Sequence, residues 1–65
     1  MFYYENSHGE ISGRLYEAGA GWVAEIGRIS QSAVSPFVAE SSARFKTHRQ
    51  AERHLKERGL VSAVV

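Results

Sequence analysis

Apolar and polar residues alternate along four segments of the chain, which is the pattern of β-strands with one buried face. The segments cover residues 2–5, 11–17, 21–29 and 37–45. Between them lie turn-forming residues: an Asn-Ser-His-Gly stretch, a glycine-rich turn, and a polar loop that ends at the only proline. We therefore predict a meandering antiparallel sheet.

The third segment, "GWVAEIGRI", holds the only tryptophan and sets the expected faces of the sheet. Trp22, Ala24 and Ile26 share one side, and charge falls on the other, so the tryptophan side should be buried. The alternation weakens after Ile26, where Gly27 indicates a bulge or the end of the strand. Regular alternation in residues 37–45 places Phe37 on the tryptophan side.

A single helix is predicted after the last of these strands. Thr47 and Gln50 have the spacing of a capping box, with Thr47 as the N-cap. No helix breaker follows until Gly59, which suits the position just after a helix. Ala51 and Leu55 form a narrow apolar stripe that would face the sheet. The terminal "LVSAVV" fits either a fifth strand or a packed tail.

These elements define an α+β protein: a four- or five-stranded antiparallel sheet with one helix packed on one face. We expect residues 1–65 to form a single domain. A chain of this size has a small core, and without cysteine it has no disulfide to support it. Its stability should therefore depend on close packing or on self-association.

The chain shows no targeting or membrane pattern. Its first residues lack a basic segment followed by an apolar one, and its longest apolar stretch is far shorter than the ~20 residues of a membrane span. We expect a soluble protein of the cytoplasm, that of a bacterial host if the protein is phage-encoded.

The sequence argues against catalysis. His48 and His54 are six residues apart, about 120° around a helix, so they do not form a metal-binding pair. His8 lies in a turn, no serine has the context of a nucleophile, and the glycine turn lacks the lysine of a phosphate loop. We expect no enzyme activity, no metal and no cofactor.

The sheet face away from the helix is the first candidate binding surface. By alternation it carries Arg14, Tyr16 and Glu25, together with an N-terminal tyrosine, either Tyr3 or Tyr4, of which we take Tyr4. Tyrosine and arginine are favoured at the energetic centres of protein interfaces. The alternative interpretation is an ordinary solvated face of an antiparallel sheet.

The helix offers the second candidate surface. The first 43 residues hold two arginines and five glutamates, whereas the last 22 hold six basic residues and two glutamates. Arg49, Arg53 and Lys56 fall on the helix side away from the sheet and could neutralise phosphates. The alternative is a solvated helix face with ion pairs to Glu52 and Glu57.

Two resemblances accompany these observations. "GWVAEI" followed by "FKTHRQAERHL" resembles plant AP2-type and phage-integrase arm DNA-binding domains, which implies a sheet inserted into DNA. In those domains the sheet carries the arginines, whereas here the positive charge falls on the helix. The longer stretch "LYEAGAGWVAEIGRI" with "SARFKTHRQAERHL" is similar in layout to small phage-encoded anti-CRISPR inhibitors of type I-F systems. That likeness implies protein binding through the exposed sheet face, with Tyr16 at the matching position.

The leading hypothesis is a protein-binding module, an inhibitor of the phage or mobile-element kind, that occludes a site on its partner. Tyr4 and Tyr16 would be anchors, and Arg14 and Glu25 would fix the register. The first alternative is a nucleic-acid-binding domain that uses Arg49, Arg53 and Lys56. The second is a homodimerising structural domain in which the free sheet face and the C-terminal segment associate.

Overall fold

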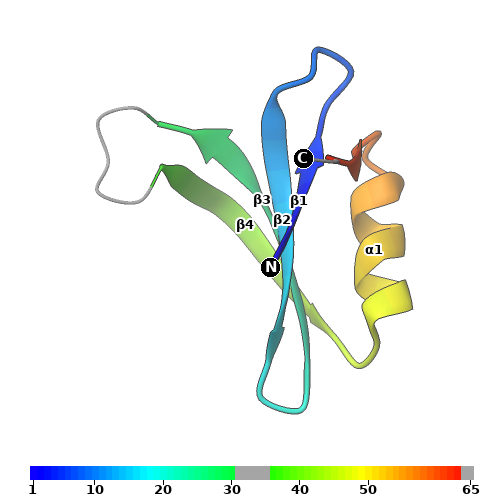
Figure 1. Cartoon of the computed structure of the whole chain (residues 1–65). Coiled ribbons are helices and arrows are strands. Elements are labelled where there is room, and N and C mark those ends of the chain that lie inside the picture. Colours follow the sequence, from blue (N-terminus) through cyan, green and yellow to red (C-terminus); the bar gives the residue numbers. More distant parts are fainter. Residues whose placement is uncertain (31–35, 64–65) are drawn as a thin grey trace.

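The computed structural model describes residues 1–30 and 36–63 as a twisted antiparallel sheet with a helix against one face (Figure 1). In chain order the elements are β1 (Phe2–Glu5), β2 (Ile11–Ala18), β3 (Gly21–Ile29), β4 (Phe37–Phe45), α1 (His48–Lys56) and β5 (Val61–Ser62). The strand order across the five-stranded sheet is β4-β3-β2-β1-β5. The predicted α+β class is confirmed. Most of the polar loop expected before the proline lies outside the described residues.

Local turn chemistry closes the first two hairpins. The side-chain oxygen of Asn6 accepts hydrogen bonds from the backbone N–H groups of His8 (2.8 Å) and Glu10 (3.1 Å). Gly9 takes a φ of +75°, a conformation that other residues adopt only at a cost. Between β2 and β3, Gly19 takes a φ of +61°. These turns fix the register of three strands.

The core lies between the helix and the sheet. Each of its central side chains is at most 5% exposed: Tyr4, Leu15, Ala24, Ala51, Leu55 and Leu60. Trp22, Ile26 and Phe45 pack against this cluster and remain partly exposed. The tryptophan side of β3 therefore faces the helix, and the predicted stripe of Ala51 and Leu55 is confirmed.

Both predicted helix ends are confirmed. The Thr47 hydroxyl accepts a hydrogen bond from the Gln50 N–H at 3.2 Å, as an N-cap does. Gly59 follows the helix with a φ of +80°, and the Leu60 N–H donates to the Leu55 carbonyl at 3.2 Å. This arrangement turns the chain so that Leu60 enters the core and the following residues reach β1.

The C-terminal segment forms a fifth strand as far as it is described. Val61 pairs with Glu5 and Ser62 with Tyr4, antiparallel to β1. The Ala63 N–H donates to the Tyr3 carbonyl at 2.9 Å and extends this pairing. The last two residues of the predicted strand lie outside the described part of the chain.

A β-bulge changes the faces of β4. Ile26 pairs with Ser41 and Gly27 with Ala39, so Glu40 is an extra residue in β4. A side chain at Gly27 would collide with the backbone of Val38 and Ala39, which explains why glycine is required at this point. The irregularity predicted at Gly27 is confirmed, and the inserted residue belongs to the neighbouring strand.

The bulge overturns the expected position of Phe37. With one residue inserted at Glu40, Phe37 pairs with Ile29 on the side of the sheet away from the helix, not with the tryptophan side. Alternation counted without the bulge gives the opposite face, because one extra residue exchanges the two sides of a strand. Phe37 is nevertheless only 5% exposed, and its surroundings belong to the site described next.

Candidate functional site

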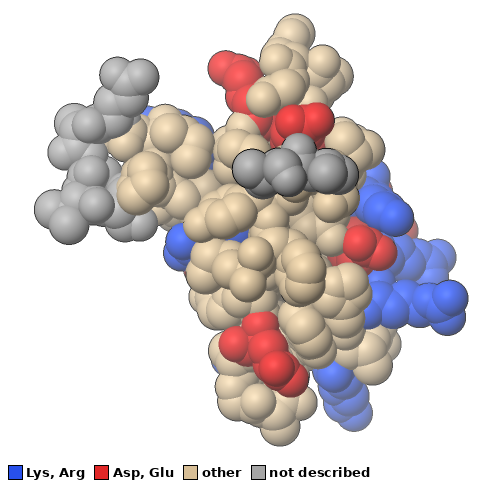
Figure 2. Space-filling view, viewed as in Figure 1, with Lys and Arg blue, Asp and Glu red and all other residues tan. Residues whose placement is uncertain are grey.

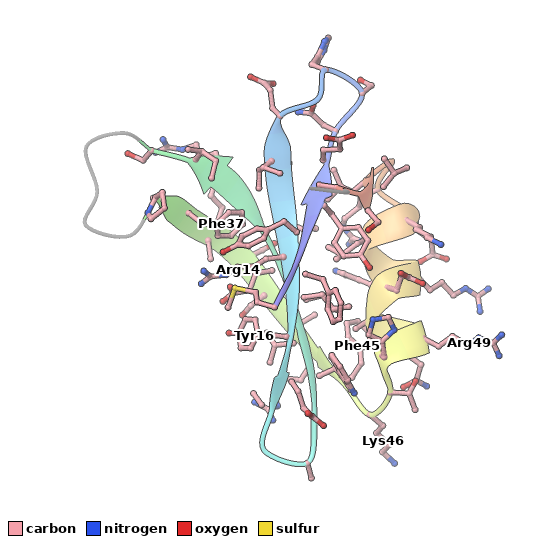
Figure 3. All side chains as sticks on the ribbon, viewed as in Figure 1. Arg14, Tyr16, Phe37, Phe45, Lys46 and Arg49 are labelled. Carbon is pink, nitrogen blue, oxygen red and sulfur yellow. The ribbon has the colours of Figure 1, made fainter. Side chains whose placement is uncertain are left out.

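The sheet surface opposite α1, called the open face here, carries a compact group of aromatic and charged side chains (Figure 3). The aromatic, charged and larger apolar residues that the strand pairing places on it include Tyr3, Arg14, Tyr16, Val23, Glu25, Ile29, Phe37 and Arg44. No described element covers this face. Even so, Val23, Glu25 and Phe37 are at most 9% exposed, because neighbouring side chains on the same face lie over them.

An ion pair forms the centre of the open face. Arg14 and Glu25 are direct cross-strand partners, and the Arg14 Nε donates a hydrogen bond to Glu25 Oε1. The Tyr16 hydroxyl donates to the other carboxylate oxygen, Oε2, at 3.2 Å. The Arg14 and Glu25 side chains are only 21% and 12% exposed, so the pair is largely removed from water. The structure thus brings together three of the four residues that the sequence predicted on this face.

Two aromatic rings also contact the guanidinium group of Arg14. The Arg14 Cζ lies 4.8 Å from the centre of the Phe37 ring and 5.7 Å from that of Tyr16, both within the range of cation–π contacts. Arg14 is therefore held by a carboxylate and by two rings at once. This arrangement gives each side chain in the group a defined position before any partner binds.

The ionisation of the group follows from its contacts. Hydrogen bonding to Glu25 raises the pKa of Arg14 above its ordinary value. Burial, reinforced by the negative charge of Glu25, raises the pKa of the Tyr16 hydroxyl. Tyr16 consequently stays protonated and remains a hydrogen-bond donor throughout the physiological pH range.

The prediction that Tyr4 lies on the open face is wrong. Tyr4 pairs with Gly13 on the helix side and is 1% exposed, with its hydroxyl donating to Glu52 at 2.7 Å. Tyr3 is the N-terminal aromatic on the open face, opposite Arg14 and 36% exposed. Period-two alternation in a four-residue strand does not show which side is buried. Here the side that packs against α1, with Tyr4 in the core, is the buried one.

The sequence also gave no role to His48. Its ring makes edge contacts with Trp22 at 4.8 Å and with Phe2 at 5.5 Å between ring centres. The start of α1 thus rests on two aromatic side chains of the sheet. The sequence carries no signal for these contacts, because Phe2 and Trp22 are distant from His48 along the chain.

Positive charge collects on the helix side of the molecule (Figure 2). Two of the three predicted basic residues are paired along the helix: Arg53 with Glu57 at 3.7 Å, and Lys56 with Glu52 at 3.6 Å. Arg49 makes no ion pair with any described residue, and it points away from the sheet (Figure 3). The predicted face exists, and the glutamates offset part of its charge.

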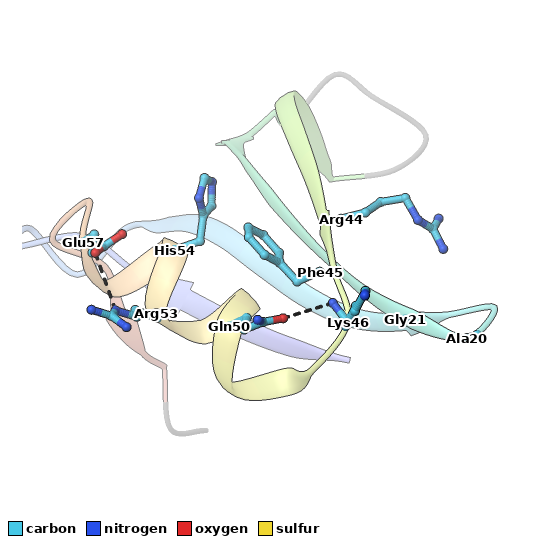
Figure 4. A pocket seen from close by; sticks show the side chains of 9 residues that line it. All are labelled: Ala20, Gly21, Arg44, Phe45, Lys46, Gln50, Arg53, His54 and Glu57. Carbon is cyan, nitrogen blue, oxygen red and sulfur yellow. Dashed lines mark hydrogen bonds and ion pairs between the residues drawn. The ribbon is translucent and has the colours of Figure 1, made fainter.

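A shallow groove runs between α1 and the end of β4 (Figure 4). We call it the α1–β4 groove. Its lining includes three basic residues, Arg44, Lys46 and Arg53, and one acidic residue, Glu57. The ring of Phe45 lies between strand and helix, 5.1 Å from that of His54. Burial, with a smaller effect of Arg58, lowers the pKa of His54.

Two features are absent from residues 1–30 and 36–63. No group of three histidine, aspartate or glutamate side chains in these ranges is placed to hold a metal ion. No helix in these ranges has the length and apolar character needed to cross a membrane.

Comparisons with family models, with curated proteins and with solved structures find no match to this chain.

Proposed function

We propose that this chain is a non-enzymatic protein-binding module that uses the open face to cover a site on another protein. The observation that carries the proposal is the ordered group of Arg14, Tyr16, Glu25 and Phe37 on a sheet face that no described element covers. A merely solvated face needs no such organisation, because isolated polar side chains would keep it in water.

Fixed side chains favour association. A side chain that is ordered only on binding loses rotamer freedom, at roughly 0.5–1.5 kcal/mol for each long one. Arg14 has already lost this freedom to its contacts with Glu25 and Phe37. The open face therefore offers a partner a surface that costs little further entropy to bind.

The members of the group have different roles in this proposal. Tyr16 and Tyr3 are the anchors, because each presents a partly exposed aromatic ring with a polar end. Arg14 and Glu25 are positioning residues that hold Tyr16. Ile29, 45% exposed and opposite Phe37, adds apolar area at one end of the face. Occlusion by such a surface would inhibit the partner without chemistry.

Nucleic-acid binding through α1 is the second candidate. The clustering of Lys and Arg on the helix side favours it (Figure 2). The ion pairs of Arg53 and Lys56 weigh against it, since a phosphate would have to compete with Glu57 and Glu52. Homodimerisation through the open face is a third candidate, and it would also enlarge the small buried core.

The test is a pull-down from a bacterial lysate with and without nuclease, in which the captured protein is then purified and its affinity measured. Tyr16→Ala is compared with Arg49→Glu, which changes only the helix surface. The proposal predicts a nuclease-resistant complex, weakened more than about fivefold by Tyr16→Ala and little by Arg49→Glu. The reverse pattern, with loss on nuclease or salt, would support nucleic-acid binding.

A further inference from the structure

We propose that the free edge of β4, together with the α1–β4 groove, is a second interaction site that takes an extended acidic peptide segment as an added strand. This site shares only Arg44 with the open face, and it stands or falls independently of the function proposed above. The proposal rests on the backbone of an edge strand, a groove beside it and the charge of that groove.

The first observation is that β4 is the outermost strand on its side of the sheet. Such a strand presents unpaired backbone N–H and C=O groups along its outer side. Its central residues, 39–42, are all exposed, and three of them are the small residues Ala39, Ser41 and Ser42. Small side chains let another backbone approach closely, as strand addition requires.

The bulge limits which part of the edge is usable. From Ser41 to Phe45 the pairing with β3 is regular, whereas Glu40 interrupts it. Glu40 also forms an exposed ion pair with Arg28 at 3.5 Å. Bulges and charges of this kind protect edges from pairing. Residues 41–45 therefore form the accessible edge, and this segment leads directly into the α1–β4 groove.

The second observation is that α1 provides a wall alongside this edge. Gln50 and His54 are four residues apart on one helix face, and Gln50 extends toward Lys46 while the His54 ring lies near that of Phe45 (Figure 4). Phe45 supplies an apolar floor beside His54. A strand added to β4 would thus lie with alternate side chains toward the helix wall.

The third observation is the charge of the groove. Of the basic residues that line the groove, Arg53 is paired with Glu57, and Arg44 extends on the open-face side of β4 with its Nη2 donating to the Ala18 carbonyl. Lys46 is therefore the positive charge that the groove offers to a partner. Lys46 makes no ion pair with a described residue. Acidic side chains on an added strand would meet complementary charge, which favours both association rate and register.

The same observations favour a peptide over the other occupants. A strand edge offers alternating donors and acceptors, which match a peptide backbone, whereas phosphate oxygens can only accept hydrogen bonds. A second copy that paired through its own β4 would bring one glutamate and one arginine, so it would not supply an acidic strand. An extended acidic segment can pair with the backbone groups of β4 and also match the positive charge of the groove.

The experiment measures the binding of a fluorescein-labelled heptapeptide of alternating glutamate and valine to the full chain by fluorescence anisotropy. Two further versions carry N-methyl groups on the glutamates or on the valines, which removes backbone donors without changing the charge. The protein variants are Lys46→Glu and Arg49→Glu. They make the same charge change near the start of α1, and only the first lies in the groove.

We expect Lys46→Glu to weaken binding roughly five- to tenfold and Arg49→Glu to change it less than about twofold. At least one N-methylated peptide should lose binding more than about tenfold, because one set of donors must face β4. Equal binding of all three peptides, equal effects of the two variants, or no binding would overturn the proposal. Tighter binding of an oligonucleotide of the same charge would also overturn it. So would self-association of the chain through β4 that the peptide cannot disrupt.

Discussion

Tyr4 joins the sheet to the helix through one hydrogen bond. Its ring is 1% exposed, and its hydroxyl reaches Glu52 at 2.7 Å. Burial, with a further effect of the Glu52 carboxylate, raises the pKa of Tyr4 far above its ordinary value. In return, the hydrogen bond from Tyr4 lowers the pKa of Glu52, with a smaller contribution from Lys56. The hydroxyl group of the buried Tyr4 therefore has a hydrogen-bond partner in the Glu52 carboxylate.

The first prediction concerns Tyr4→Phe, which removes the hydroxyl and keeps the ring. We expect a loss of about 1 kcal/mol in the free energy of unfolding near neutral pH. Because the folded pKa of Glu52 is lowered, the stabilisation is complete above the ordinary glutamate pKa of about 4.3 and is lost as pH falls through the lower folded value. Urea unfolding from pH 3 to 7 measures it. A difference between wild type and variant that does not shrink in acid would contradict this account.

The second prediction contrasts two ion pairs. Glu25→Gln leaves the largely buried Arg14 without its charged partner, so we expect a loss of about 1–2 kcal/mol. Glu40→Gln removes an exposed pair with Arg28, whose side chain is 64% exposed, and should cost less than about 0.5 kcal/mol. Chemical denaturation of both variants checks the contrast. Equal costs would mean that the open-face pair is no better held than a surface pair.

At the scale of the elements, the bulge between β3 and β4 decides which side chains meet. Without the extra residue at Glu40, Phe37 would lie on the helix side and Arg14 would lose its contact with the Phe37 ring. Gly27 permits the bulge, because the backbone of Val38 and Ala39 occupies the space that a side chain would need. The bulge thus places Phe37 on the open face, beside the group that β2 and β3 form there.

The third prediction follows from the close approach of Gly27 to the backbone of Val38 and Ala39. Gly27→Ala should destabilise the fold by more than about 2 kcal/mol, because the added methyl group meets backbone that cannot move without breaking strand pairing. Gly9→Ala is the control: it has a positive φ and no atom near its Cβ, so only backbone strain of about 1–2 kcal/mol is expected. Thermal unfolding and the NMR shifts of β4 separate the two. A tolerated Gly27→Ala would contradict the role given to the bulge.

The strands and the helix could be predicted from the sequence because the signals for them are local. Alternation and turn residues define the strands, and Thr47 and Gly59 define the two ends of the helix. The side of the sheet on which each residue lies was harder to predict, since it depends on contacts between residues distant in sequence. The side of β1 was set by packing of Tyr4 under α1, and that of Phe37 by a bulge whose extra residue sits in another strand.

At the scale of the whole molecule, the two sides of the sheet have different chemistry. The helix side holds the apolar core and most of the positive charge, and the open face holds an aromatic and charged network (Figures 2 and 3). Arg14, Tyr16 and Glu25 could be predicted together because they alternate on adjacent strands. The choice of Tyr3 over Tyr4 could not be made from the sequence, and the α1–β4 groove could not be predicted, because neither follows from the pattern of a single segment.

The central claim, that the open face contacts another protein, is tested most directly by site-specific photocrosslinking. A benzoylphenylalanine replaces Tyr3 on the open face, Lys46 in the groove or Arg49 on the outer helix, and each protein is irradiated in a nuclease-treated bacterial lysate. We predict a discrete protein adduct from position 3 that is absent from position 49 and is lost when Tyr16→Ala is added. Adducts from position 49 alone, or only adducts between two copies of this chain, would contradict the claim.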